Sequence, residues 1–151
     1  MSGFTLRRAV VDDREIVIDL LEELFEPPGQ RPANYSRSRA GEGFEWAVTT
    51  PEAEIMLAVE DRRLVGLCSV YLDFPSMRFG WRCWIEDLVV QPNHRSLGVG
   101  RLLLEAAADW GKQRGASHLE LDSAGVRHDA HRFYLSAGMT QASLLFARGI
   151  G

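Results

Sequence analysis

Hydrophobic and polar residues change their spacing along this chain, and the spacing predicts an ordered series of strands and helices. Residues 4–10 are predicted to form a first strand. An apolar series with helical spacing follows Asp12, which we expect to be the N-cap of a helix that ends before Pro27. Residues 29–43 are polar and glycine-rich, which indicates a loop or a short mobile helix, and residues 44–50 fit the end of a second helix.

The middle of the chain reads as a hairpin, a further strand and an amphipathic helix. Strands are predicted over 54–60 and 64–72, joined by a tight antiparallel hairpin at Asp61-Arg62-Arg63, and a third over 82–90. A helix is predicted over about 99–114, with Gly115 at its end. The apolar residues that recur on one face of this helix are Leu102, Leu103, Ala106, Ala107 and Trp110.

The last third of the chain continues the alternation of strands and helices. We expect a short strand over 118–122, a helix over 129–137 with Gly138 at the C′ position, and a closing strand over 143–148. Hairpins come first in the chain and helical crossovers later, which favours a mixed sheet covered by helices. At 151 residues the chain fits a single domain over residues 1–151.

Composition and charge narrow the class of protein. The chain is 46% hydrophobic and 25% charged, as in ordinary globular proteins, and its net charge of −4 argues against a nucleic-acid binder. It contains no apolar run of about 18 residues and no apolar leader after Met1, so we expect a cytoplasmic protein that does not bind membranes. Cys68 and Cys83 are expected to be reduced, buried thiols, and the histidines do not complete a metal site.

The segment with the clearest chemical meaning is the turn between the strand over 82–90 and the helix that begins near residue 99. Residues 95–100 read Arg-Ser-Leu-Gly-Val-Gly, and a glycine turn at a helix N-terminus directs backbone N–H groups at one point that suits a phosphate. Arg101 follows where a Walker A loop needs Lys, and the third glycine of a Rossmann loop is absent. A coenzyme A pyrophosphate site and a plain structural turn remain.

The order of three motifs is similar to that of the GCN5-related N-acetyltransferase (GNAT) family, over essentially the whole chain. Residues 95–100 match the family's Arg/Gln-x-x-Gly-x-Gly/Ala motif, residues 86–92 match the strand before it, and residues 131–139 match the late helix with its Tyr-x-x-x-Gly ending. Two positions depart from the family pattern. Arg127 stands where many members have Asn, so that contact is not transferred, and Met139 replaces Phe.

The resemblance implies a fold, a cosubstrate and a set of site residues. The fold is α/β, with a mixed, mostly antiparallel central sheet flanked by helices on both faces, and the activity is an acetyl-CoA-dependent acyltransferase without a metal. Tyr134 would be the acid that protonates the leaving sulfur. The residues implied in acetyl-CoA binding are Leu88, Val89, Val90, Arg95, Ser96, Leu97, Gly98, Val99, Gly100, Arg101 and Tyr134.

The strand over 82–90 carries two adjacent carboxylates in apolar surroundings, Glu86 and Asp87. Acyl transfer to an amine needs a base, because an alkylammonium has no lone pair, and a carboxylate with a raised pKa suits this role. Glu86 is the first candidate and Asp87 the second. Adjacent strand residues point to opposite faces, so we expect only one of them to face the cleft. A structural salt bridge or an edge-exposed charge is the other interpretation.

The sequence says less about the amine that accepts the acetyl group than about the donor. Seven acidic residues within 12–26 could favour a cationic substrate, but a solvated acidic helix face is the interpretation that we prefer. Arg31, Arg37 and Arg39 could hold a carboxylate or phosphonate, but here too we prefer a solvated mobile loop. We expect acetyl transfer to a primary amine of a small molecule by direct attack, since no cysteine accompanies a His/Asp pair. The alternatives are a protein N-terminus or lysine as acceptor, or a non-catalytic acyl-CoA-binding regulatory domain. A homodimer remains open.

Overall fold

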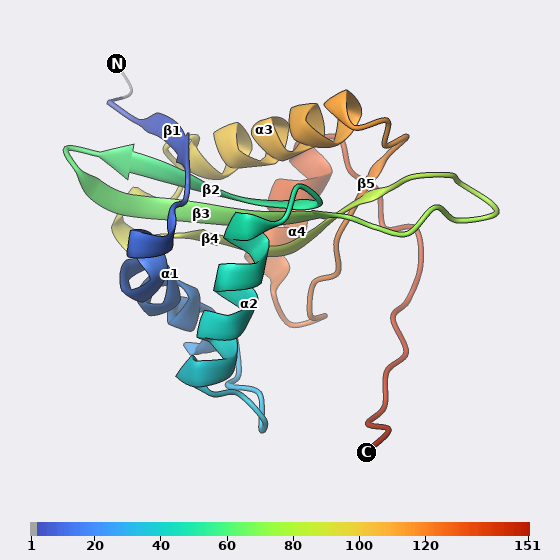
Figure 1. Cartoon of the computed structure of the whole chain (residues 1–151), viewed down its shortest axis with the longest axis horizontal. Helices are drawn as coiled ribbons and strands as arrows, with labels where there is room; N and C mark the ends of the chain where they lie inside the picture. Colours follow the sequence, from blue (N-terminus) through green and yellow to red (C-terminus); the bar gives the residue numbers. More distant parts are fainter. Residues whose placement is uncertain (1–2) are drawn as a thin grey trace. The chain divides into compact units, whose positions relative to one another are not determined.

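The computed structural model describes residues 3–151 and divides into two compact units, one extending to Leu121 and the other spanning Asp122–Gly151. The first unit holds the sheet and three α-helices, and the second holds one (Figure 1). The elements are β1 (Thr5–Arg8), η1 (Val11–Asp13), α1 (Arg14–Leu21), η2 (Glu22–Phe25), α2 (Arg37–Thr49), β2 (Ala53–Glu60), β3 (Arg63–Leu72), β4 (Cys83–Val90), η3 (Pro92–His94), α3 (Val99–Gln113), β5 (Leu119–Glu120) and α4 (His128–Ser136).

The sheet has the strand order β1-β2-β3-β4-β5, antiparallel except for the parallel pair β4–β5. This confirms the expected mixed, mostly antiparallel sheet. The predicted hairpin joins β2 to β3 through Asp61 and Arg62, whose φ angles are 49° and 67°. Positive φ at both central residues is the feature of a type I′ turn, whose twist matches that of the strands it joins.

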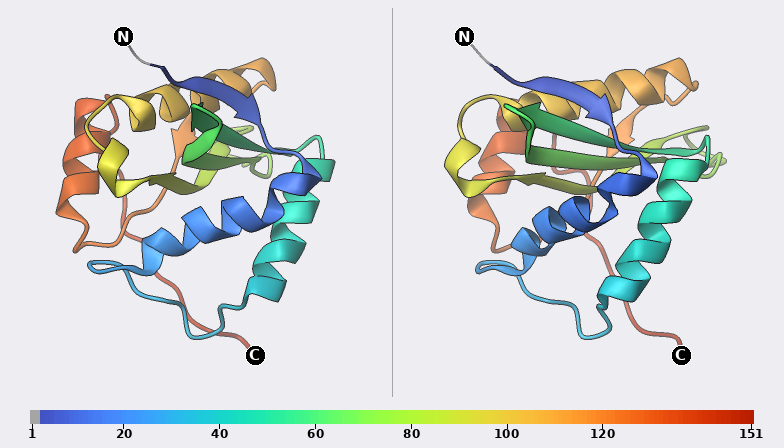
Figure 2. Two further views of the ribbon diagram at one scale, coloured as in Figure 1. Left: turned by 90° about the vertical axis from the view of Figure 1, so that its left-hand side faces the viewer. Right: turned by 60° about the vertical axis from the view of Figure 1, so that its left-hand side comes forward.

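Helices cover both faces of the sheet, as expected. Figure 2 shows α3 on one face and α1 and α2 on the other. The main core lies between the sheet and the α1/α2 layer, where residues of α1 and α2 meet the inward side chains of β2, β3 and β4. The buried residues of this core include Val17, Leu20, Phe44, Ala47, Ile55, Leu57, Leu67 and Val89.

The opposite face is packed closely enough that two glycines are required. A Cβ on Gly66 would lie 2.9 Å from Cγ1 of Val99, and a Cβ on Gly111 would collide with the Cys83 sulfur. The start of α3 is therefore pressed against β3. The predicted apolar face of α3 is wrong at Leu102, which is exposed, whereas Leu104 is buried. The buried side of the helix is the one that carries Val99, Leu103, Ala107, Trp110 and Gly111, and Leu104 lies on the same face as Gly111 while Leu102 does not.

The first helix begins later than predicted, and Asp12 is not its N-cap. Residues Val11–Asp13 form a 3₁₀ turn, and the buried carboxylate is that of Asp13. Asp13 accepts a 2.8 Å hydrogen bond from the Val10 N–H and two from the Arg7 guanidinium, which holds the pKa of Asp13 below its ordinary value. The helical series also ends as a 3₁₀ turn, Glu22–Phe25, rather than as one continuous α-helix.

The second helix is longer than its apolar pattern suggested. It starts at Arg37, seven residues before the predicted stretch, and Ser36 is its N-cap, with its hydroxyl oxygen accepting a 3.1 Å bond from the Arg39 N–H. Its first turns consist largely of glycine, serine and arginine, so they show no apolar residues at helical spacing. The hydrophobic pattern therefore could not predict the first half of this helix.

The second unit contains α4 and a C-terminal segment without regular structure. The predicted helix end is confirmed: Gly138 has φ of 89°, and the Met139 N–H donates to the Tyr134 carbonyl over 3.0 Å. The predicted strand over 143–148 is wrong, since none is assigned in the described chain beyond Glu120. Leu144, Leu145 and Phe146 are all more than two-thirds exposed. An apolar run forms a strand only where a partner supplies the ladder.

Candidate active site

A β-bulge in β4 shapes the candidate site. Along β3 and β4, Ser69 pairs with Asp87 and Val70 pairs with Ile85, which leaves Glu86 as an extra residue without a partner across the ladder. A bulge of this kind interrupts the alternation of faces. The expectation that Glu86 and Asp87 point to opposite faces is therefore wrong: both carboxylates lie on the α1/α2 side of the sheet, with Tyr71 and Trp84.

Glu86 is exposed and hydrogen-bonded to a neighbouring aromatic side chain. The Trp84 indole N–H donates to Oε2 of Glu86 over 2.7 Å. The bond links residues two apart on the same side of the strand and fixes the direction of the carboxylate. Glu86 is thus an accessible anion beside the aromatic surface of Trp84.

Asp87 has a different environment and a different acidity. The Ser69 hydroxyl donates to Oδ2 of Asp87 over 2.8 Å, and the Asp87 N–H donates to the same hydroxyl oxygen over 3.0 Å. Burial raises the pKa of Asp87 to about 6, with the Ser69 hydrogen bond acting against this and the Glu86 charge adding to it. Asp87 is ionised at neutral pH and can still accept a proton readily, which suits a general base.

Three aromatic side chains lie beside these carboxylates. Tyr71, across the ladder from Trp84, stacks on Trp46 of α2 with ring centroids 6.0 Å apart and an interplanar angle of 13°. Burial, followed by the charges of Asp87 and Glu86, raises the pKa of Tyr71 to about 12. Sequence reasoning missed both Tyr71 and Ser69. The polar Ser69 inside the apolar run of β3 was the available signal.

A cavity of about 310 Å³ opens at this aromatic group, lined by Tyr71, Leu72, Asp73 and Trp84. The Oδ2 oxygen of Asp73 accepts a 3.1 Å hydrogen bond from the Arg82 guanidinium, and Arg82 also pairs with Glu120 over 3.1 Å. The cavity therefore lies on the same face as the two candidate bases and has a carboxylate in its wall.

Beyond Trp84, β4 has no strand partner on its β5 side among the described residues. Among the described residues, β5 pairs with β4 only through Leu119 and Glu120, opposite Cys83 and Trp84. The two strands therefore separate before Leu88, Val89 and Val90, the segment whose main chain was expected to meet the pantetheine arm. A separated strand edge presents N–H and C=O groups that a ligand can pair with.

The turn over 95–100 leads directly into α3, as predicted. Gly98 has φ of 88° and precedes the first helical residue, Val99, whose buried side chain packs under Gly66. Ser96 also has a positive φ, 63°. Ser96, Leu97, Gly98 and Arg101 are exposed at the helix start. The N–H groups of a first helical turn have no partner within the helix, so this turn fits a phosphate group.

Two side chains attach this turn to the sheet. The Arg95 Nε donates to the Val90 carbonyl over 3.3 Å, and His94 Nε2 lies 2.9 Å from the Glu60 carboxylate at the end of β2. Arg95 therefore lies in the turn and also contacts Val90, the last residue of the β4 segment that was expected to meet the pantetheine arm.

Tyr134 lies on α4 in the second unit. It is partly buried, and its ring lies 5.4 Å from that of Phe133. Its predicted role depends on the sequence motif, and Gly138 ends its helix as that motif requires.

The arginines considered as acceptor ligands make contacts within the α1/α2 layer. Arg37 pairs with three carboxylates, Glu15 at 2.8 Å and Asp19 and Glu22 at 2.9 Å. Arg39 donates to the Asn34 carbonyl over 3.2 Å, and the Arg31 guanidinium lies 4.7 Å from the Tyr35 ring centroid. These contacts favour the structural interpretation of the three arginines.

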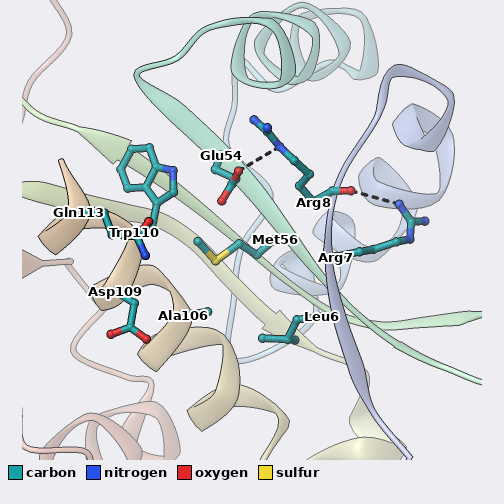
Figure 3. A pocket seen from close by; sticks show the side chains of 9 residues that line it. All are labelled: Leu6, Arg7, Arg8, Glu54, Met56, Ala106, Asp109, Trp110 and Gln113. Carbon is teal, nitrogen blue, oxygen red and sulfur yellow. Dashed lines mark hydrogen bonds and ion pairs between the residues drawn. The ribbon is translucent and has the colours of Figure 1, made fainter.

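A second cavity of about 310 Å³ lies between β1, β2 and α3, away from the predicted site residues (Figure 3). Arg8 and Glu54 form an ion pair in its wall at 3.0 Å, beside Met56 and Trp110. Within residues 3–151, the structure holds no group of three or more His, Cys, Asp or Glu side chains placed to bind a metal, and no helix has the length and apolar character needed to cross a membrane.

Comparisons with known proteins show which family this chain belongs to. The model of the acetyltransferase (GNAT) family matches residues 15–139. Aminoalkylphosphonate N-acetyltransferase of Salmonella typhimurium (strain LT2) is 32% identical over 145 residues, which cover 96% of this chain and 90% of that protein.

Solved structures share the fold at lower identity. Aminoglycoside N-acetyltransferase AAC(6')-Iy in complex with CoA has a TM-score of 0.84 at 16% identity, covering 99% of this chain and 96% of that one. Glucosamine-6-phosphate N-acetyltransferase from Arabidopsis thaliana has a TM-score of 0.79 at 22% identity, covering 99% and 100%. The chain belongs to the acetyltransferase (GNAT) family, and its identification as an acetyltransferase from the sequence is confirmed.

Proposed function

We propose that this acetyltransferase transfers the acetyl group of acetyl-CoA to a primary amine of a small molecule by direct attack in a ternary complex. The observation that carries the proposal is the β4 bulge, which brings Glu86 and Asp87 to one face of the sheet beside a cavity of small-molecule size. The relative that is 32% identical is named for a small amine acceptor, an aminoalkylphosphonate, which supports this class of reaction.

The turn over 95–100 and the start of α3 fit the pyrophosphate of acetyl-CoA. Gly98, with φ of 88°, precedes the first turn of α3, whose N–H groups have no partner within the helix, and the basic residues Arg95 and Arg101 are exposed beside it. The open edge of β4 at Leu88, Val89 and Val90 would hold the pantetheine arm, and one of its N–H groups would stabilise the charge that develops on the carbonyl oxygen. Acetyl-CoA supplies, when bound, a thioester carbon that an amine lone pair can attack.

We now prefer Asp87 to Glu86, the first candidate, as the general base. Burial raises the pKa of Asp87 to about 6, which supports this role because a base works best with a pKa near the operating pH. Asp87 would take the proton from the substrate ammonium, and the exposed Glu86 would hold that ammonium before transfer. As the C–N bond forms and the C–S bond breaks, Tyr134 would give its phenolic proton to the leaving sulfur, and the resulting phenolate would take the second proton that the nitrogen loses as the amide forms.

The proposal is tested by free-thiol release from acetyl-CoA with a panel of small primary amines and with peptides that have a free N-terminus or lysine. We expect turnover with small amines well above that with peptides. Tyr134→Phe should lose at least tenfold in kcat while CoA binding, measured by calorimetry, changes less than threefold. Faster turnover of peptides would refute the small-molecule acceptor, and CoA binding without turnover of any amine would refute the enzymatic proposal.

A further inference from the structure

The cavity beside the candidate bases has an aromatic and acidic wall. Tyr71 and Trp84 face each other across the β3–β4 ladder, and Asp73 continues the wall where β3 ends. Glu86 accepts the indole N–H of Trp84, so its charge lies next to the same ring. At about 310 Å³ the cavity has room for one end of a small molecule.

The charges around this cavity leave an excess of negative charge. Arg82 lies between two carboxylates, Asp73 and Glu120, each at 3.1 Å, and Glu120 also lies 2.8 Å from His118 Nε2. Glu86 and Asp87 add two further carboxylates on the same side of the sheet. A cation entering the cavity meets the Asp73 carboxylate and the aromatic rings of Tyr71 and Trp84, and the nearby carboxylates of Glu86 and Asp87 also attract it, whereas they repel a phosphonate.

The arginines that could have received an anionic substrate are held by internal contacts. Arg37 is matched by three carboxylates within 2.9 Å, so that cluster carries more negative than positive charge. Arg39 donates to a backbone carbonyl, and Arg31 lies over the Tyr35 ring. These contacts do not prepare a phosphonate site.

We propose that the acceptor is an amine with a second cationic group, which is held at the cavity lined by Tyr71, Leu72, Asp73 and Trp84 while the reacting amine lies at Asp87. This inference rests on the proposed function, since it assigns the acceptor class of the same site. It predicts that this chain prefers a different acceptor from one that ends in a phosphonate, the kind of amine for which its 32% identical relative is named.

Three amines of equal length test the proposal: 1,6-diaminohexane, 1-aminohexane and 6-aminohexylphosphonate, which differ only in the far end group. We expect kcat/KM for the diamine to exceed that for aminohexane at least tenfold, and the phosphonate to be the poorest of the three. The preference for the diamine should shrink at 1 M NaCl because exposed charges are then screened. Calorimetric binding of each amine to the CoA-loaded protein should follow the same order.

Asp73→Asn is the diagnostic variant, because asparagine keeps an oxygen for the Phe74 N–H while removing the charge. It should reduce the preference for diamine over monoamine to below threefold. Asp61→Asn is the matched control: Asp61 is an exposed turn residue with φ of 49°, a conformation that asparagine adopts readily, and its activity and preference should match the native protein.

The outcomes separate this inference from the function on which it rests. Turnover of all three amines with equal kcat/KM, or best turnover of the phosphonate, overturns the second cation and leaves the small-amine acetyltransferase standing. Tight binding of the diamine without its acetylation overturns the proposed function instead. If none of the amines binds or reacts while peptides are acetylated, both proposals are wrong.

Discussion

Replacing Asp87 by asparagine is predicted to stabilise the protein and to inactivate it. Burial raises the pKa of Asp87 to about 6, roughly two pH units above the ordinary value of 3.8, so the folded protein binds this proton more tightly than the unfolded chain. The protonated carboxyl therefore stabilises the fold below about pH 4, and that stabilisation is lost as the pH rises through 6. At 1.4 kcal/mol per unit the full effect is about 3 kcal/mol, and solvent contact reduces it to about 1–3 kcal/mol.

Asparagine is isosteric with aspartate and carries no charge, and its amide oxygen can still accept the bond from the Ser69 hydroxyl. The free energy of unfolding, from urea titrations, should thus be about 1–3 kcal/mol higher for Asp87→Asn than for the native chain at pH 8 and nearly equal at pH 4. The control, Asp61→Asn, should show no such dependence, because Asp61 is exposed in the β2–β3 turn.

The same variant should lose activity by about 10²–10⁴-fold in kcat/KM, the usual contribution of a positioned base. In the native enzyme kcat/KM should rise between pH 5 and 7 as Asp87 ionises, and the variant should lack this rise. A difference in unfolding free energy that does not change from pH 4 to 8 would refute the burial argument. Retained activity with an unchanged pH profile would instead remove Asp87 from the chemistry.

Three further changes test other parts of the structure. Gly66→Ala places a methyl group 2.9 Å from Val99. Overpacking costs about 1–3 kcal/mol and removing glycine returns about 0.5–1 kcal/mol, so the free energy of unfolding in urea should fall by about 0.5–2 kcal/mol. Gly43→Ala, in open space within α2, is the control and should raise the free energy of unfolding. Gly98→Asp should raise the Kd for CoA by at least tenfold in calorimetry, because φ of 88° is lost and a negative charge enters the phosphate site; unchanged binding by the folded variant would contradict the turn's assignment. Arg37→Ala should lower Tm in low salt and have less effect at 1 M NaCl, whereas an equal loss at both salt concentrations would mean that packing rather than charge is responsible.

Much of the fold was predictable because local signals agreed with one another. The β2–β3 hairpin has two residues that adopt positive φ between two strongly apolar strands, and α3 has an apolar stripe that ends at Gly115. The closing strand over 143–148 was wrong for a different reason. Its apolar run satisfies strand composition, but pairing is a property of two segments, and a pattern in one segment says nothing about its partner.

The candidate site shows the same division between local and tertiary information. Gly98 and the start of α3 follow from the glycine spacing alone, since a turn before a helix is a local feature. The relation between Glu86 and Asp87 could not be predicted, because the register between β3 and β4 determines it. Strict alternation along one strand gave the wrong faces, and the register shift, with Asp87 bonded to Ser69 and Glu86 to Trp84, is what indicates that the two carboxylates lie on one side.

The bulge at Glu86 also makes the site sensitive to chain length and not only to residue identity. Removing this one residue would let Ile85 and Asp87 continue a regular ladder opposite Val70 and Ser69, so the sheet itself has no need of it. A single-codon deletion at this position would therefore leave a well-formed strand that lacks the second carboxylate beside Trp84. Substitution scans test only the side chains of the site, whereas a scan of insertions and deletions along β4 would test whether activity depends on the extra residue in the strand.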